Sequence, residues 1–64
     1  MNHNEVIREL LAMPTGTRRA FGPVDVKRDG TGDYWCATTP RGYTAYFHCS
    51  GMAAIVISWN GFRA

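Results

Sequence analysis

The chain has 64 residues, of which 45% are hydrophobic, and seven basic against five acidic residues give it a formal charge of +2. This length predicts one small domain whose core is near the lower limit for independent folding. The hydrophobic fraction excludes an intrinsically disordered chain, and the mild charge lacks the dense basic content that makes nucleic acid the default partner.

Neither a membrane span nor a secretory signal is predicted. No stretch approaches the roughly 18 apolar residues that cross a bilayer. Near the N-terminus, Arg8 and Glu9 interrupt the apolar residues, so an apolar signal-peptide core does not form. Two cysteines are too few for the disulfide framework of a small secreted scaffold. We therefore expect a cytoplasmic protein with reduced thiols.

The first predicted element is an amphipathic helix over about residues 3–13. Asn2, followed three residues later by Glu5, is typical of a helix N-cap. Pro14 disfavours helical geometry at the residue before it and ends the helix. The apolar residues that recur at helical spacing are Val6, Ile7, Leu10 and Leu11.

A β-meander is predicted over about residues 20–60. Its first strand runs through Phe21 and Val26, and Gly22 and Pro23 interrupt it as an edge strand or a bulge would. The polar segment 15–19 is expected to be a connector. The turn residues 29–33 then join the first strand to a second strand that begins at Tyr34.

The loop of the next hairpin predicts which residues of its two strands pair. Residues 40–42 favour a three-residue loop with Gly42 in the left-handed conformation. That loop pairs Ala37 with Ala45 and Trp35 with Phe47.

A last strand over residues 53–59 is expected to complete the meander. With a three-residue loop at residues 50–52, it would pair Ile55 with Phe47 and Ile57 with Ala45. A two-residue loop would invert the faces of this strand. We prefer the three-residue loop because it brings the largest apolar residues together.

These elements predict an α+β fold, in which one N-terminal helix packs on one face of a three- or four-stranded antiparallel β-meander within a single domain, residues 1–64. The helix would cover the face that carries Trp35 and Phe47. The opposite face would remain open, and we expect it to bind a protein partner. Its candidate binding residues are Tyr34, Thr44, Tyr46, His48 and Val56. The competing interpretation is an ordinary solvated sheet face.

Nucleic acid is the alternative partner. Exposed aromatics on an open sheet can stack on bases, and basic loops can contact phosphates. The candidate residues are Arg18, Arg19, Lys27, Arg28 and Arg41. Neither RNP aromatics nor a helix-turn-helix pattern accompanies them. A small anionic ligand such as a nucleotide at residues 16–19 is a weaker alternative, since the P-loop spacing is missing.

Metal binding, cofactor binding and catalysis are not predicted. A zinc site would have to use His3, Cys36, His48 and Cys49, but His48 and Cys49 are adjacent in a predicted strand and so point to opposite faces. The same geometry argues against a disulfide between Cys36 and Cys49. Cys36 and His48 could share a face as a nucleophile and a base, yet no acid accompanies them to orient the base.

The sequence therefore predicts a small non-catalytic binding protein that acts through a protein–protein interaction. Inhibitors and accessory proteins of phages and mobile elements are of this kind. Homodimerisation would add the burial that so small a core lacks.

Overall fold

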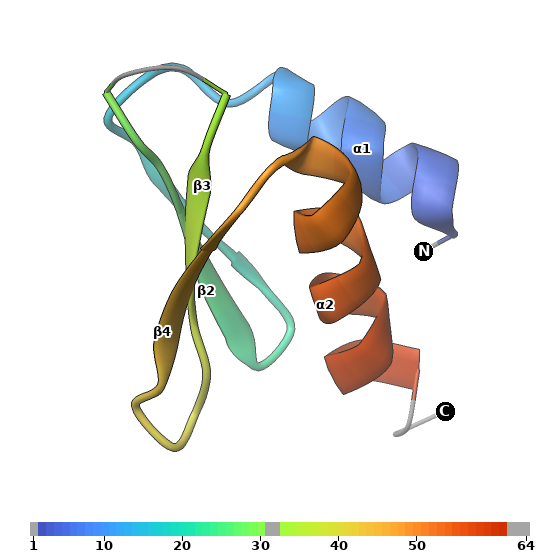
Figure 1. The fold of residues 1–64 in the computed structure, drawn as a ribbon. Coiled ribbons are helices and arrows are strands. Elements are labelled where there is room, and N and C mark those ends of the chain that lie inside the picture. The colour runs from blue at the N-terminus through green and yellow to red at the C-terminus, as the bar shows by residue number, and fades with distance from the viewer. Residues whose placement is uncertain (1, 31–32, 62–64) are drawn as a thin grey trace.

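The computed structural model describes residues 2–30 and 33–61 of the chain. In chain order it contains α1 (His3–Leu11), β1 (Arg18–Phe21), β2 (Val24–Arg28), β3 (Trp35–Thr38), β4 (Thr44–Phe47) and α2 (Cys49–Gly61). The strands form one antiparallel sheet in the order β1-β2-β3-β4, and both helices lie on the same face of it (Figure 1). The predicted α+β class, with an N-terminal helix on one face of an antiparallel meander, is confirmed.

The helix α1 begins at the predicted cap. The Asn2 backbone N–H donates to Glu5 Oε1 at 3.0 Å, and the Glu5 N–H donates to Asn2 Oδ1 at 2.9 Å, which completes a capping box. Val6 and Leu10 are fully buried one turn apart. Leu11, which the spacing predicts in the buried stripe, is 63% exposed, because it lies about 100° round the helix from the buried Leu10.

The segment around Phe21 is a hairpin and not one interrupted strand. Residues 22–23 form the two-residue turn between β1 and β2, where Phe21 pairs with Val24 and Arg19 with Val26. Gly22 has a φ of +60°, which a tight hairpin of this kind requires. As a consequence, Arg18 and Arg19 lie in a strand, whereas a connector was predicted.

The predicted register of the later hairpin is confirmed. Trp35 pairs with Phe47 and Ala37 with Ala45 across β3 and β4. Gly42 has a φ of +88°, in the left-handed region expected for the three-residue loop. The pairing of β2 with β3 is also as predicted, while residues 31–32 of the predicted turn lie outside the described residues.

The prediction of a last strand over residues 53–59 is wrong, because this segment belongs to α2. Its expected pairs with β4 do not form, and in the described part of the chain β4 pairs with β3 alone. Residues 52–57 are continuously apolar, and such a run carries no period that separates a strand from a buried helix. The helix is favoured because it turns Met52, Ala53 and Val56 toward the core together.

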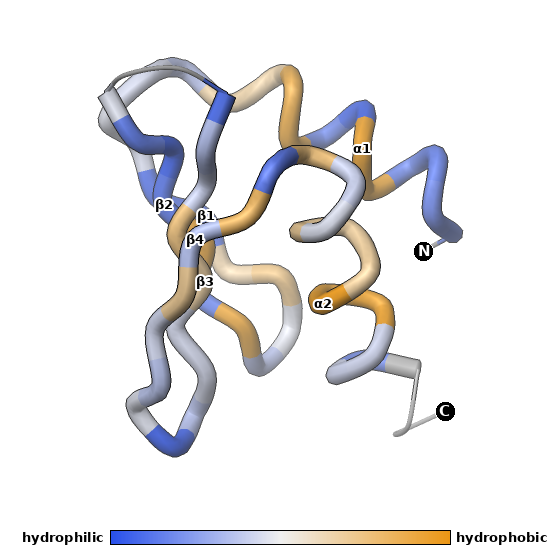
Figure 2. Tube along the Cα trace, in the orientation of Figure 1, coloured by the Kyte–Doolittle hydropathy of each residue, from blue (hydrophilic) through white to orange (hydrophobic). Residues whose placement is uncertain are grey.

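The core lies between the sheet and the two helices. It contains Val6, Leu10, Met13, Phe21, Val24, Val26, Trp35, Ala37, Met52, Ala53 and Val56. Trp35 is at its centre, and its indole Nε1 donates to the Leu10 carbonyl at 3.3 Å. Figure 2 shows the consequence for the helices: hydrophobic colour is continuous through the middle of α2, whereas it alternates with hydrophilic colour along α1.

Among the described residues, neither helix has the length and apolar character needed to cross a membrane.

Candidate partner-binding face

The side of the sheet that faces away from both helices is open, and we call it the outer face. Opposed residues in an antiparallel ladder project to the same side, so the strand register defines its members. They are Arg18, Ala20, Asp25, Lys27, Tyr34, Cys36, Thr38, Thr44, Tyr46 and His48. Among the described residues none of these side chains is fully buried, whereas the alternate residues Val24, Val26, Trp35 and Ala37 are buried under the helices.

Three aromatic side chains lie at one end of the outer face. The rings of Tyr34 and His48 stack with their centroids 4.3 Å apart and their planes tilted by 35°. His48 Nδ1 lies 3.2 Å from the Asp33 carbonyl oxygen, so the tautomer with a proton on Nδ1 can donate there. Tyr46 opposes Cys36 in the β3–β4 ladder and is 61% exposed. The cluster is therefore partly held in place and still open to solvent.

The Tyr46 hydroxyl lies near two groups that are negative when ionised, Cys36 and Asp29. Its pKa is raised above the ordinary value of 10.0, first because the ionised Cys36 thiol would repel a phenolate and then because the Asp29 carboxylate does so. A hydrogen bond with Cys36 acts in the same direction. At neutral pH Tyr46 therefore presents a neutral hydroxyl that can both donate and accept a hydrogen bond.

Four of the five predicted partner-binding residues lie on the outer face. Tyr34, Thr44, Tyr46 and His48 are all exposed there. Val56 is not among them, because it belongs to α2 and is only 2% exposed within the core. Its expected place on the outer face depended on the strand that the structure replaces with a helix.

The predicted nucleic-acid residues do not gather into one basic surface. Arg18 lies on the outer face with its Nε 3.8 Å from a carboxylate oxygen of Asp25. Arg19 is on the opposite face, where it forms an ion pair with Glu9 of α1. Lys27 and Arg41 are exposed, the first on the outer face and the second in the β3–β4 loop.

The Arg28 side chain packs against Trp35. Its guanidinium carbon lies 4.0 Å from the centroid of the Trp35 ring, a cation–π contact. Its Nε and Nη1 are buried and have no hydrogen-bond partner among the described residues. Three of the five candidate cations are thus engaged by neighbouring side chains, which leaves little free charge for a phosphate backbone.

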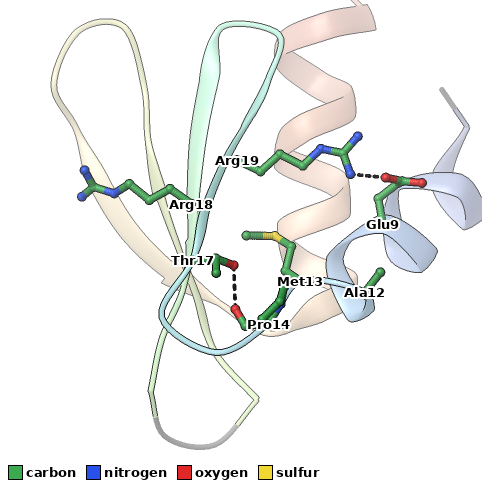
Figure 3. Close-up of a pocket in the computed structure, with 7 residues that line it drawn as sticks. All are labelled: Glu9, Ala12, Met13, Pro14, Thr17, Arg18 and Arg19. Atoms are coloured by element: carbon green, nitrogen blue, oxygen red, sulfur yellow. Dashed lines mark hydrogen bonds and ion pairs between the residues drawn. The ribbon is translucent and has the colours of Figure 1, made fainter.

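A depression of about 320 Å³ lies between α1 and β1 and is lined by Thr17, Arg18 and Arg19 of the segment 16–19, the predicted alternative site for a small anion (Figure 3). The ion pair of Arg19 with Glu9 places a carboxylate at this site, and Figure 3 shows Arg18 directed away from it. The Thr17 hydroxyl donates to the Pro14 carbonyl at 2.6 Å. The groups that would hold an anion here are therefore already paired or turned away.

The two cysteines lie in different elements of the fold. Cys36 is half-buried on the outer face, and Cys49 begins α2; both are free thiols. Burial raises the pKa of Cys49, and the nearby Arg28 opposes this shift without cancelling it. In the described part of the chain, no group of three or more His, Cys, Asp or Glu side chains converges as metal ligands do.

Sequence reasoning missed the charged half of the outer face. Asp25 and Lys27 alternate with the buried Val24 and Val26, so the signal was present in the period of two. The prediction of one interrupted strand through Phe21 and Val26 hides this alternation, because the structure has a hairpin there. The face therefore combines an aromatic end with a polar part on β1 and β2 that carries two cations, Arg18 and Lys27, and one carboxylate, Asp25.

Comparison of the chain with protein-family models, with curated proteins and with solved structures finds no match.

Proposed function

We propose that the protein is a small non-catalytic binding protein, an inhibitor or accessory protein, that binds another protein through its outer face. The observation that carries this proposal is the cluster of Tyr34, Tyr46 and His48 on the side of the sheet that neither helix covers (Figure 1). Tyrosine is enriched at the energetic centre of protein interfaces, since it buries a large rigid ring and keeps a polar tip.

The rest of the face suits a protein better than a nucleic acid. Arg18 pairs with Asp25 on β1 and β2, and Asp29 lies near Tyr46, so cations and carboxylates are mixed across the outer face. Such a mixed polar rim is typical of protein–protein interfaces. A nucleic-acid surface would need unpaired cations along the track of the backbone. An open sheet face can bury a partner's surface but does not enclose a substrate away from water, which supports a non-catalytic role.

Photo-crosslinking tests where the partner binds. A photoreactive phenylalanine analogue placed at Tyr46 should crosslink to one protein in extracts of the organism that makes the chain. The matched control is the same analogue at Tyr43, which is 70% exposed but lies on the helix side of the sheet. Equal crosslinking from both positions, or from neither, would contradict a specific site on the outer face.

Affinity measurements with the captured partner then test the chemistry. Tyr46→Ala should weaken binding by about 30-fold, the loss expected for an interfacial tyrosine at the centre of a contact. The combined change of Arg18→Ala and Arg19→Ala should have a small effect, and binding should depend weakly on salt. If nucleic acid is captured in place of a protein, and the double arginine change flattens the salt dependence of its binding, the proposal is wrong.

A further inference from the structure

The two edges of the sheet differ in how they are protected. The β1 edge carries Arg18 and Arg19, and both arginines are held by carboxylates. The β4 edge contains no charged residue and no proline from Tyr43 to Phe47, and Thr44, Ala45 and Tyr46 are exposed on both faces of the strand. Natural sheets guard their free edges with charge, proline or bulges, so an unguarded edge is a site for strand pairing.

The hydrogen-bond pattern of β4 identifies which backbone groups are free. The Thr39 N–H donates to the Tyr43 carbonyl at 2.9 Å, so Tyr43 faces the neighbouring strand. Hydrogen-bonded and non-hydrogen-bonded pairs alternate in an antiparallel ladder, and Ala45 and Phe47 therefore also direct their backbone groups at β3. The N–H and C=O groups of Thr44 and Tyr46 point away from the sheet.

We propose that this edge pairs with β4 of a second copy of the chain, antiparallel and about a two-fold axis at Ala45. In this register Thr44 of one copy is the hydrogen-bonded partner of Tyr46 of the other. The outward N–H and C=O groups of Thr44 and Tyr46 therefore form hydrogen bonds in both copies. Ala45 opposes its own counterpart as a non-hydrogen-bonded pair. The two sheets become one, with both outer faces on the same side.

A second copy fits this edge for two reasons. The register is self-complementary, and it places two small alanines at the axis, where the strands approach most closely. It also sets Tyr43, which is 70% exposed, opposite the half-buried Phe47 of the other copy on the helix side. Cross-strand aromatic pairs of this kind stabilise sheets. This dimer does not depend on the proposed function, since it uses the strand edge and not the outer face.

A charge swap at Ala45 tests the dimer. The wild-type chain should dimerise with a dissociation constant on the order of 10 μM, because one pair of short strands forms only a small interface. Ala45 is exposed, so a longer side chain there can extend into solvent. Ala45→Lys and Ala45→Glu should each be monomeric in sedimentation velocity, since like charges oppose each other at the axis. An equimolar mixture of the two variants should form a heterodimer, identified by native mass spectrometry.

Proline variants test the edge itself. Thr44→Pro removes an N–H that points away from the sheet and should abolish dimerisation while circular dichroism shows an intact fold. Ala20→Pro is the matched control, since it removes the equivalent outward N–H from β1, and it should leave the dimer intact. A wild-type chain that stays monomeric at 500 μM, about 50 times the expected dissociation constant, would overturn the proposal. So would a dimer that survives both Ala45 variants, or one that Ala20→Pro alone abolishes.

Discussion

The contact between the β1–β2 turn and the end of α2 predicts a measurable cost for Gly22→Ala. Gly22 has a φ of +60°, and a Cβ there would lie 2.8 Å from Cγ of Asn60. The Asn60 amide donates to the carbonyls of Phe21 at 3.0 Å and Val56 at 2.8 Å, so it ties the turn to the helix. The substitution would both strain the backbone and displace this amide.

The two costs can be estimated separately. A left-handed conformation costs a residue with a Cβ about 1–2 kcal/mol, and the loss of a hydrogen bond to Phe21 adds about 1 kcal/mol. The free energy of unfolding should therefore fall by about 2–3 kcal/mol. For a chain of this length, at roughly 0.05–0.15 kcal/mol per residue, the total is only about 3–10 kcal/mol. We expect Tm to drop by about 10–20 °C.

Thermal and urea unfolding with a matched control test this reasoning. Gly16→Ala is the control, because Gly16 has a φ of +82° but no atom within 4 Å of an added Cβ, so only the backbone strain remains. In an Asn60→Ala background, the additional cost of Gly22→Ala should also fall to the strain alone. If Gly22→Ala costs no more than Gly16→Ala, or costs the same in both backgrounds, the Asn60 contact is not responsible.

Three further predictions concern the helices. Met52→Ala should lower the free energy of unfolding by about 2–5 kcal/mol in urea titrations, because Met52 is fully buried. The control Ala54→Ser, on the exposed side of α2, should change this free energy by less than about 0.5 kcal/mol. Asn2→Ala should cost about 1 kcal/mol by removing the capping box, and Asn2→Asp should restore most of it. The folded state raises the pKa of the Cys49 thiol above its ordinary value of 9.0. The stability that the protonated thiol contributes is therefore complete below pH 9.0 and is lost as pH rises through the folded-state pKa. In measurements of the free energy of unfolding against pH, Cys49→Ala should reduce this loss of stability at alkaline pH.

The parts of the fold that local signals determine could be predicted from the sequence. The capping box of Asn2 and Glu5 and the loop at residues 40–42 each lie within a few residues of the element they start or turn. Once the loop fixes the register of β3 and β4, alternation alone places Tyr46 on the outer face. Most of the candidate residues depend on this one hairpin, which is why the predicted register places them on the same face as the structure does.

The parts that depend on packing could not be predicted in this way. Residues 52–57 are apolar on every side, and their β-branched members Ile55, Val56 and Ile57 favour a strand locally. The helical state follows from contact with α1 and from the burial of Met52 under the sheet, both of which are non-local. Val56 was assigned to the wrong surface for the same reason.

The replacement of the last strand by α2 also decides how β4 can be used. A strand over residues 53–59 would have placed β4 in the middle of the sheet and paired the backbone of Thr44 and Tyr46. As an edge strand, β4 leaves the backbone of Thr44 and Tyr46 unpaired by a further strand of the described sheet and the Tyr46 side chain exposed, which is what the two proposals require. These two uses are separable by substitution, since Ala45→Lys opposes the dimer from the helix side of the sheet and Tyr46→Ala removes a ring from the outer face. A monomeric Ala45→Lys variant that still binds the partner would show that the outer face acts without the dimer, whereas loss of both at once would show that the partner binds across the two-fold axis.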